Sequence, residues 1–332
     1  MLRLPPFTYL MPEQIDEAID MFTTHQETAM FVAGGTDLYP GMKRRIFEPK
    51  TLISLGNLTA LHTFSVTEDG MTLGSSMTLT QIANHPLIQT HYPALATAAG
   101  LVSTPQLRNV GTLGGNLCVD TRCTYYNQSE SWREALGYCM KKDGHICWVA
   151  TSSKKCLAVQ SSDTAPILIA LDAQVCLAGP NGTRWLPVAA LYQNDGIHYF
   201  CKQPDEILTK VYIPTSEQSA AQATRTTYHK LRRRGSFDFP VLSVAVALQQ
   251  ADDGTCLDVR IVLGAVSSAP VRAKAAEEYL IGQQMTAETI EEAASKAYQP
   301  AKPLDNTDMT ISYRKQMARV YVARALEEVA QI

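Results

Sequence analysis

Cysteine residues are concentrated in one polar stretch of the chain. Five of the eight cysteines lie there: Cys118, Cys123, Cys139, Cys147 and Cys156. The stretch has few periodic apolar positions, so it can bury little surface of its own. A long insertion of this kind inside a compact domain is usually functional or disordered. A bound metal or cluster is a third way to fold it, because metal binding contributes folding free energy.

The spacing of the cysteines bears on the choice of metal. Zinc sites usually contain short C-x2-4-C hooks, whereas the gaps from Cys123 onward are C-x15-C-x7-C-x8-C. Four widely spaced thiolates suit a [4Fe–4S] cluster, because each of its irons takes one cysteine. Three alternatives stay open: the cluster, zinc, and free or buried thiols. The choice of four among the five also stays open, since Cys118 and Cys123 form a C-x4-C step.

The composition is that of an ordinary globular protein. The chain has 332 residues, of which 45% are hydrophobic and 18% charged, with a net charge of −3. This length fits two or three domains, and the near-neutral charge argues against nucleic acid as a partner. No apolar run is long enough to span a membrane. The first residues lack the apolar segment of a signal peptide, so the cysteines indicate a reducing cytoplasm.

The first part of the chain predicts a small α/β lobe that ends near residue 56. We expect strands at Phe7–Leu10, Met30–Val32 and Leu52–Ser54 and a helix over Pro12–Thr24. The tetrapeptide Gly34-Gly35-Thr36-Asp37 follows the second strand. A Gly-Gly pair there exposes backbone N–H groups that can hold a phosphate. By itself the tetrapeptide also fits a plain turn, and it is not a G-x-G-x-x-G fingerprint.

A second lobe follows, over residues 57–214. It begins with a hairpin of His62–Val66 and Met71–Leu73, followed by helices at Thr78–Ala83 and Ala94–Ala99. A second pair, Gly114-Gly115, then stands between Thr112 and Asn116. Two separate Gly-Gly loops, each after a strand-like run, favour a nucleotide cofactor held in a cleft.

The end of this lobe is predicted to be mainly strands. Asp163 is placed to cap a helix over Ile167–Leu171, or to accept a hydrogen bond from a cofactor hydroxyl. Three strands are expected after it: Gln174–Leu177, Arg184–Leu186 and Glu206–Ile213. The last is predicted to be an edge strand, and the polar run Thr215–Thr224 is predicted to be a linker.

The remaining residues, 224–332, predict an α+β domain. Two strands, Val241–Gln249 and Leu257–Leu263, are expected to carry helices on one face of their sheet. The helices are expected at Ala273–Ile281, Ala287–Ala297 and Ser312–Val329. Lys230 and Arg232–Arg234 form a basic group that fits either a solvated charge run or a clamp on an anionic cofactor or partner.

Four motifs occur in a characteristic order: AGGTDL, QLRNVGTLGGN, SDTAPILIALDA and YHKLRRRGSFDF. In this order they resemble the FAD-binding subunit of the xanthine dehydrogenase/molybdenum hydroxylase family, over nearly the whole chain. The resemblance implies an α+β fold. It consists of a PCMH-type FAD-binding domain of two α/β lobes, 1–56 and 57–214, followed by a CO-dehydrogenase-flavoprotein-like C-terminal domain, 224–332.

The cysteine-rich insertion, at about 118–160, resembles that of the β subunits of 4-hydroxybenzoyl-CoA reductases within this family. This resemblance implies that Cys123, Cys139, Cys147 and Cys156 bind a [4Fe–4S] cluster and that Cys118 does not. Bacterial aldehyde oxidoreductases of the family also carry a cluster near an RCTY sequence. Their later cysteines are arranged differently, so they are the second candidate.

The resemblance further implies noncovalent FAD. The residues that match the family's FAD contacts are Phe31, Val32, Ala33, Gly34, Gly35, Thr36, Asp37, Leu38, Thr112, Gly114, Gly115, Asn116, Asp163, Leu208 and Lys230.

The implied role is electron transfer without substrate chemistry on this chain. The implied partners are a large molybdopterin subunit, a small [2Fe–2S] subunit and ferredoxin as donor, for conversion of 4-hydroxybenzoyl-CoA to benzoyl-CoA. Other classes stay open: a subunit of an aldehyde or purine hydroxylase, a stand-alone flavin oxidase, and a non-catalytic scaffold whose cysteines hold zinc.

Overall fold

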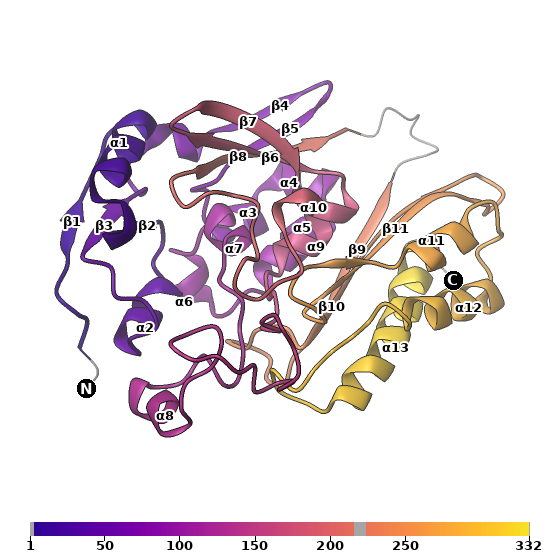
Figure 1. Ribbon diagram of the computed structural model, residues 1–332. Helices are drawn as coiled ribbons and strands as arrows, with labels where there is room; N and C mark the ends of the chain where they lie inside the picture. The colour runs from indigo at the N-terminus through magenta and orange to yellow at the C-terminus, as the bar shows by residue number, and fades with distance from the viewer. Residues whose placement is uncertain (1–2, 216–223, 332) are drawn as a thin grey trace.

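The computed structural model describes residues 3–215 and 224–331, and these residues form three sheets surrounded by helices (Figure 1). In chain order the sheets have three, five and four strands. The mixed helix and strand architecture predicted from the sequence is therefore confirmed. The predicted linker Thr215–Thr224 lies almost wholly outside the described residues.

The first sheet is parallel, in the order β1-β3-β2. Its elements are β1 (Thr8–Leu10), α1 (Ile15–His25), β2 (Ala29–Val32), α2 (Leu38–Lys43) and β3 (Thr51–Ser54). The prediction that α1 includes Pro12 is wrong. Gln14 precedes the helix with extended backbone angles, so the first turn begins at Ile15. Ala18, Ile19 and Phe22 form the buried face of α1, as their helical spacing indicates.

The second sheet has the strand order β4-β5-β8-β6-β7. Its strands are β4 (Phe64–Thr67), β5 (Gly70–Gly74), β6 (Gln174–Gly179), β7 (Gly182–Pro187) and β8 (Ile207–Pro214). The prediction that β8 is an edge strand is wrong, because it pairs with β5 on one side and with β6 on the other. Alternation along a strand reports which face is buried, but it does not report how many neighbours the strand has.

The helices of the second lobe are short. They are α3 (Leu79–Asn84), α4 (Pro86–His91), α5 (Pro93–Gly100), α6 (Pro105–Arg108), α7 (Leu113–Leu117), α8 (Glu130–Ala135), α9 (Thr164–Ala170) and α10 (Val188–Leu191). The second Gly-Gly pair therefore lies in α7 and not in a loop after a strand. Thr112 caps this helix, since its Oγ1 accepts a hydrogen bond of 3.0 Å from the Gly115 amide, and a cap offsets the low helix propensity of glycine.

The third sheet is antiparallel and is covered on both faces. Its elements are β9 (Arg225–Leu231), β10 (Leu242–Gln250), β11 (Cys256–Gly264), β12 (Val271–Arg272), α11 (Lys274–Leu280), α12 (Ala287–Ala297) and α13 (Ile311–Ala330). Helices α11 and α13 pack against its strands, as expected from the sequence. Helices α5 and α9 of the second lobe also pack on it, and Tyr228, Ala245 and Ala247 belong to that lobe's core. In the described part of the chain, no helix is both long and apolar enough to cross a bilayer.

The cysteine-rich insertion leaves and rejoins the second lobe at one point. Arg122 and Val159 exchange two backbone hydrogen bonds of 2.8 Å, so its ends lie side by side. The insertion has a small apolar cluster, to which Ile46, Phe47 and Ile197 contribute from outside it. It is also held from outside, because Asn306 Nδ2 donates to the Leu157 carbonyl at 2.6 Å. In Figure 1 it carries α8 and lies below the two lobes.

The C-terminal domain depends on a buried arginine, which gives a testable prediction. Arg314 has no exposed surface. It donates to the carbonyls of Val241, Leu304 and Ala265 at 2.9, 2.7 and 2.7 Å, and burial lowers its pKa to about 10. Arg314→Met leaves these carbonyls without their donor, so we expect a loss of about 3 kcal/mol in the free energy of unfolding.

The matched control for this prediction is Arg319→Met, on the same helix. Arg319 pairs with Glu291 on the surface, and exposed pairs contribute less than about 1 kcal/mol. Denaturant titration followed by circular dichroism measures both variants. Equal destabilisation by the two substitutions contradicts the role given to Arg314.

Candidate functional site

A cavity of about 750 Å³ opens between the two lobes and the C-terminal domain. It has the size typical of ligand sites. Of the fifteen residues predicted to contact a cofactor, all except Lys230 line it. They are Phe31, Val32, Ala33, Gly34, Gly35, Thr36, Asp37, Leu38, Thr112, Gly114, Gly115, Asn116, Asp163 and Leu208. Residues far apart in the sequence are thus brought together around one cavity.

The first glycine pair shapes the chain at the end of β2. A Cβ on Gly34 would lie 2.1 Å from the Val110 carbonyl oxygen, which belongs to the segment before α7. Gly35 has a φ of +67°, a conformation that glycine adopts without strain. The need for glycine at 34 therefore comes from contact between the two glycine segments. The sequence interpretation, which assigned it to the approach of a phosphate, missed this cause.

The second pair has two different environments. A Cβ on Gly114 would lie 2.7 Å from the Ser75 Cβ, so Gly114 is required by packing on the second sheet. Gly115 is exposed to the cavity. Asn116 uses its side-chain oxygen to accept hydrogen bonds from Ser162 Oγ at 2.8 Å and Thr164 Oγ1 at 2.7 Å. Asn116 therefore connects α7 to the start of α9 in addition to lining the cavity.

Asp163 does not cap α9 with its side chain, although it stands at the N-cap position. Its carboxylate instead accepts hydrogen bonds from the Tyr228 hydroxyl at 2.7 Å and from Lys230 Nζ at 2.9 Å. Asp163 and Lys230 are both almost completely buried, and burial raises the pKa of Asp163 while the charge of Lys230 opposes that rise. The capping prediction is wrong because two partners on β9, remote in sequence, bind the carboxylate.

Lys230 does not line the cavity, but its ammonium group donates to Asp163, which does. Its ammonium group also donates to the Leu101 carbonyl at 3.0 Å, and Arg232 donates to the same carbonyl at 3.0 Å. Within the basic group, Arg233 pairs with Asp308 on the surface. Only Arg234 of the three arginines lines the cavity, where it pairs with Asp238. The basic group therefore has mixed roles, mostly contacts within the chain.

An ion pair joins the first glycine segment to the insertion. Arg122 Nη1 donates to Asp37 Oδ1 at 2.8 Å, and the Arg122 guanidinium lies 3.9 Å from the centre of the Phe239 ring. Burial raises the pKa of Asp37, and Arg122 opposes this rise. All three residues line the cavity. Sequence reasoning missed Arg122 and Phe239, since the pattern around each gives no signal of a partner so far along the chain.

The four predicted cysteine ligands are all buried. None is more than 9% exposed, and Cys123, Cys139 and Cys156 belong to one apolar cluster with Tyr126 and Ile46. Burial raises the pKa of Cys156 to about 11, with smaller contributions that include the Cys147 and Cys139 thiols. The four thiols therefore lie near one another. Cys118 lies outside this group, as expected; it is partly exposed and lines the cavity.

Among the described residues, no three His, Cys, Asp or Glu side chains are grouped closely enough to hold one metal ion. This spacing disfavours a zinc site, in which four ligands surround one ion. It is compatible with a cluster of four irons, each with its own cysteine, because such ligands stand further apart. Four buried thiols are the donor type and number that a cluster of four irons requires.

Two family models together match nearly the whole chain. The FAD binding domain in molybdopterin dehydrogenase matches residues 5–216, and the CO dehydrogenase flavoprotein C-terminal domain matches residues 226–329. The cavity described above thus lies largely within a matched FAD-binding domain.

Two curated proteins are similar to this chain over most of their length. The aldehyde oxidoreductase FAD-binding subunit of Escherichia coli is 32% identical over 275 residues, 79% of this chain and 82% of that protein. The nicotinate dehydrogenase FAD-subunit of Eubacterium barkeri is 28% identical, over 93% of this chain and 91% of that protein.

The structure of carbon monoxide dehydrogenase from Hydrogenophaga pseudoflava aligns with a TM-score of 0.80 at 26% identity. The alignment covers 99% of this chain and 98% of that one. Together with the matched domains, these similarities show that the chain belongs to the family of FAD-binding subunits of molybdenum hydroxylases.

Proposed function

We propose that the chain is an electron-transfer subunit that holds FAD in the cavity and a [4Fe–4S] cluster on Cys123, Cys139, Cys147 and Cys156. One observation carries this proposal: the buried cysteines adjoin the cavity through Cys123. Arg122 lines the cavity, and the next residue, Cys123, belongs to the cysteine group. A single short segment therefore adjoins both proposed cofactors.

When bound, FAD accepts and releases electrons singly or in pairs, which lets it connect one-electron and two-electron partners. The chain's own residues bind and orient it. Gly115 would leave room for the pyrophosphate, and Asp163 would accept a hydrogen bond from an FAD hydroxyl. The contact predicted for Lys230 is indirect, because its ammonium group fixes the Asp163 carboxylate. Leu208, from β8, contributes apolar surface to the cavity.

The cluster, when bound, supplies a one-electron centre. Binding requires that four thiols lose their protons, since the thiolate is the ligand. Burial raises the pKa of Cys123 to about 12, and it raises that of Cys156 to about 11. Cluster assembly therefore has to release these protons, and it stabilises the folded insertion in return.

The finer proposal concerns the complex. The cysteine spacing that resembles the β subunits of 4-hydroxybenzoyl-CoA reductases supports a role in reductive dehydroxylation to benzoyl-CoA. The chain then works with a molybdopterin subunit and a [2Fe–2S] subunit and receives electrons from ferredoxin in the cytoplasm. A second candidate is an aldehyde oxidoreductase, which the E. coli relative at 32% identity favours. In both, substrate chemistry takes place on another chain.

The first of three predictions about this function tests the FAD site. A leucine at position 115 projects into the cavity and displaces Thr112 Oγ1, which would lie 2.9 Å from its Cβ. We expect Gly115→Leu to lower FAD affinity at least tenfold, or about 1.4 kcal/mol, with the flavin measured after denaturation. Gly56→Leu, at an exposed glycine outside the cavity, is the control. Full flavin occupancy in Gly115→Leu contradicts the assignment.

The second prediction tests the cluster ligands. Alanine at Cys123, Cys139, Cys147 or Cys156 should reduce bound iron to below about one tenth of the wild-type value, because an incomplete ligand set does not retain a cube. FAD should remain, since its cavity is built mainly outside the insertion. Iron analysis and EPR of the dithionite-reduced protein measure this. The control is Cys118→Ala, which should keep the cluster. If Cys118→Ala loses the cluster, or if Cys139→Ala retains it, the proposed ligand set is wrong.

The third prediction tests the substrate. The purified complex with a reduced donor should convert 4-hydroxybenzoyl-CoA to benzoyl-CoA, with kcat/KM at least about a hundredfold above that for oxidation of benzaldehyde. Product analysis by chromatography measures both reactions. The opposite preference supports the aldehyde oxidoreductase candidate and rejects the reductase.

A further inference from the structure

A buried cation lies between the cysteine group and the cavity. The Lys141 side chain is 6% exposed, and that of its partner Asp120 is 12% exposed. Burying an ammonium group is strongly disfavoured unless its protons find acceptors. Lys141 Nζ donates to Asp120 Oδ1 at 2.6 Å and to the Gly196 carbonyl at 2.7 Å, and its third acceptor is Thr121 Oγ1. Each of the three ammonium protons therefore has a hydrogen-bond acceptor.

Aromatic rings enclose the same ammonium group. Lys141 Nζ lies 4.7 Å from the centre of the Tyr126 ring and 4.8 Å from that of Tyr199, within the range of cation–π attraction. The Tyr126 hydroxyl donates to Asp120 Oδ2 at 2.9 Å. Asp120 and Tyr199 line the cavity, whereas Tyr126 packs in one apolar cluster with the proposed ligands Cys123, Cys139 and Cys156. The ion pair thus spans the boundary between the two proposed cofactor sites.

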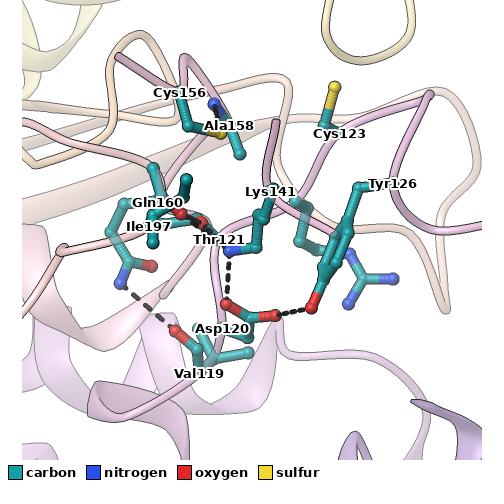
Figure 2. Close-up of polar contacts among 12 residues, drawn as sticks. Val119, Asp120, Thr121, Cys123, Tyr126, Lys141, Cys156, Ala158, Gln160 and Ile197 are labelled. Atoms are coloured by element: carbon teal, nitrogen blue, oxygen red, sulfur yellow. Dashed lines mark hydrogen bonds and ion pairs between the residues drawn. The ribbon is translucent and has the colours of Figure 1, made fainter. Parts of the chain in front are cut away.

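Gly196 connects Lys141 to one of the proposed ligands. The Gly196 amide donates to the Cys156 carbonyl at 2.9 Å, and a Cβ on Gly196 would lie 2.6 Å from Cys156 Sγ. Gly196, whose carbonyl accepts a hydrogen bond from Lys141, therefore packs directly on the Cys156 sulfur. Figure 2 shows Lys141 with Asp120 below it, Tyr126 beside it and Cys156 and Cys123 above it.

We propose that Lys141 is a positioning residue for the [4Fe–4S] cluster and that its fixed positive charge favours the reduced cluster. This inference rests on the proposed function. One-electron reduction by a ferredoxin-type donor adds one negative charge to the cluster, and a nearby buried cation stabilises that charge. Cluster potentials respond to local charge, hydrogen bonding and solvent exposure. A residue that acts only as a structural support changes cluster content without a sign-dependent change in potential.

The test is an EPR-monitored redox titration of the intact three-subunit complex. Lys141→Met should lower the equilibrium constant for cluster reduction about tenfold, which equals about 59 mV for a one-electron couple. Asp120→Asn removes the opposite charge and should shift the potential upward. Lys141→Arg retains the charge and should stay near the wild-type value. Lys154→Met, at an exposed lysine of the same insertion, is the control and should change nothing.

Each outcome bears on the inference. An unchanged potential in Lys141→Met with full iron content overturns it, as does a shift of the same sign in Lys141→Met and Asp120→Asn. If Lys141→Met loses the cluster, the shift in Asp120→Asn decides: an upward shift supports the inference, and its absence overturns it. A wild-type complex without a [4Fe–4S] signal instead rejects the proposed function itself, so the two failures are distinguishable.

Discussion

The hydrogen bonds of the Lys141 ammonium group illustrate the constraint under which the insertion folds. A polar segment buries too little apolar surface to offset its conformational entropy, so it needs strong contacts with the rest of the chain. Lys141 bonds to the Gly196 carbonyl, and the buried Arg133 bonds to the Arg44 and Arg45 carbonyls at 3.1 and 2.9 Å. Charged side chains that bind backbone carbonyls thus replace an extensive core.

This anchoring places two sites beside each other. The segment that leaves α7 lines the cavity through Val119, Asp120 and Arg122 and enters the cysteine group at Cys123. The Arg122–Asp37 pair holds the same segment against the first glycine pair. A subunit that transfers electrons between two centres needs such rigid adjacency. In the proposed function, the Arg122–Asp37 and Lys141–Asp120 ion pairs provide this rigidity.

The sequence predicted features that depend on local pattern, including the positions of most strands and both glycine pairs. It did not predict features that depend on partners remote in the chain. Asp163 reads as a helix cap, but Tyr228 and Lys230 bind its carboxylate. The β8 strand alternates like an edge strand, but β5 and β6 flank it. Arg122 and Lys141 carry no local signal, since their roles arise only when the insertion docks.

We propose that the insertion carries a cluster next to a flavin, and the metal content of the purified chain is the sharpest test of this proposal. The wild-type chain, purified under anaerobic conditions, should contain four irons and four acid-labile sulfides for each FAD, because each cysteine of a [4Fe–4S] cube binds one iron. Elemental analysis together with flavin absorbance gives these ratios in one sample. Flavin accompanied by one zinc ion, or by no metal at all, is incompatible with a [4Fe–4S] cluster on this chain.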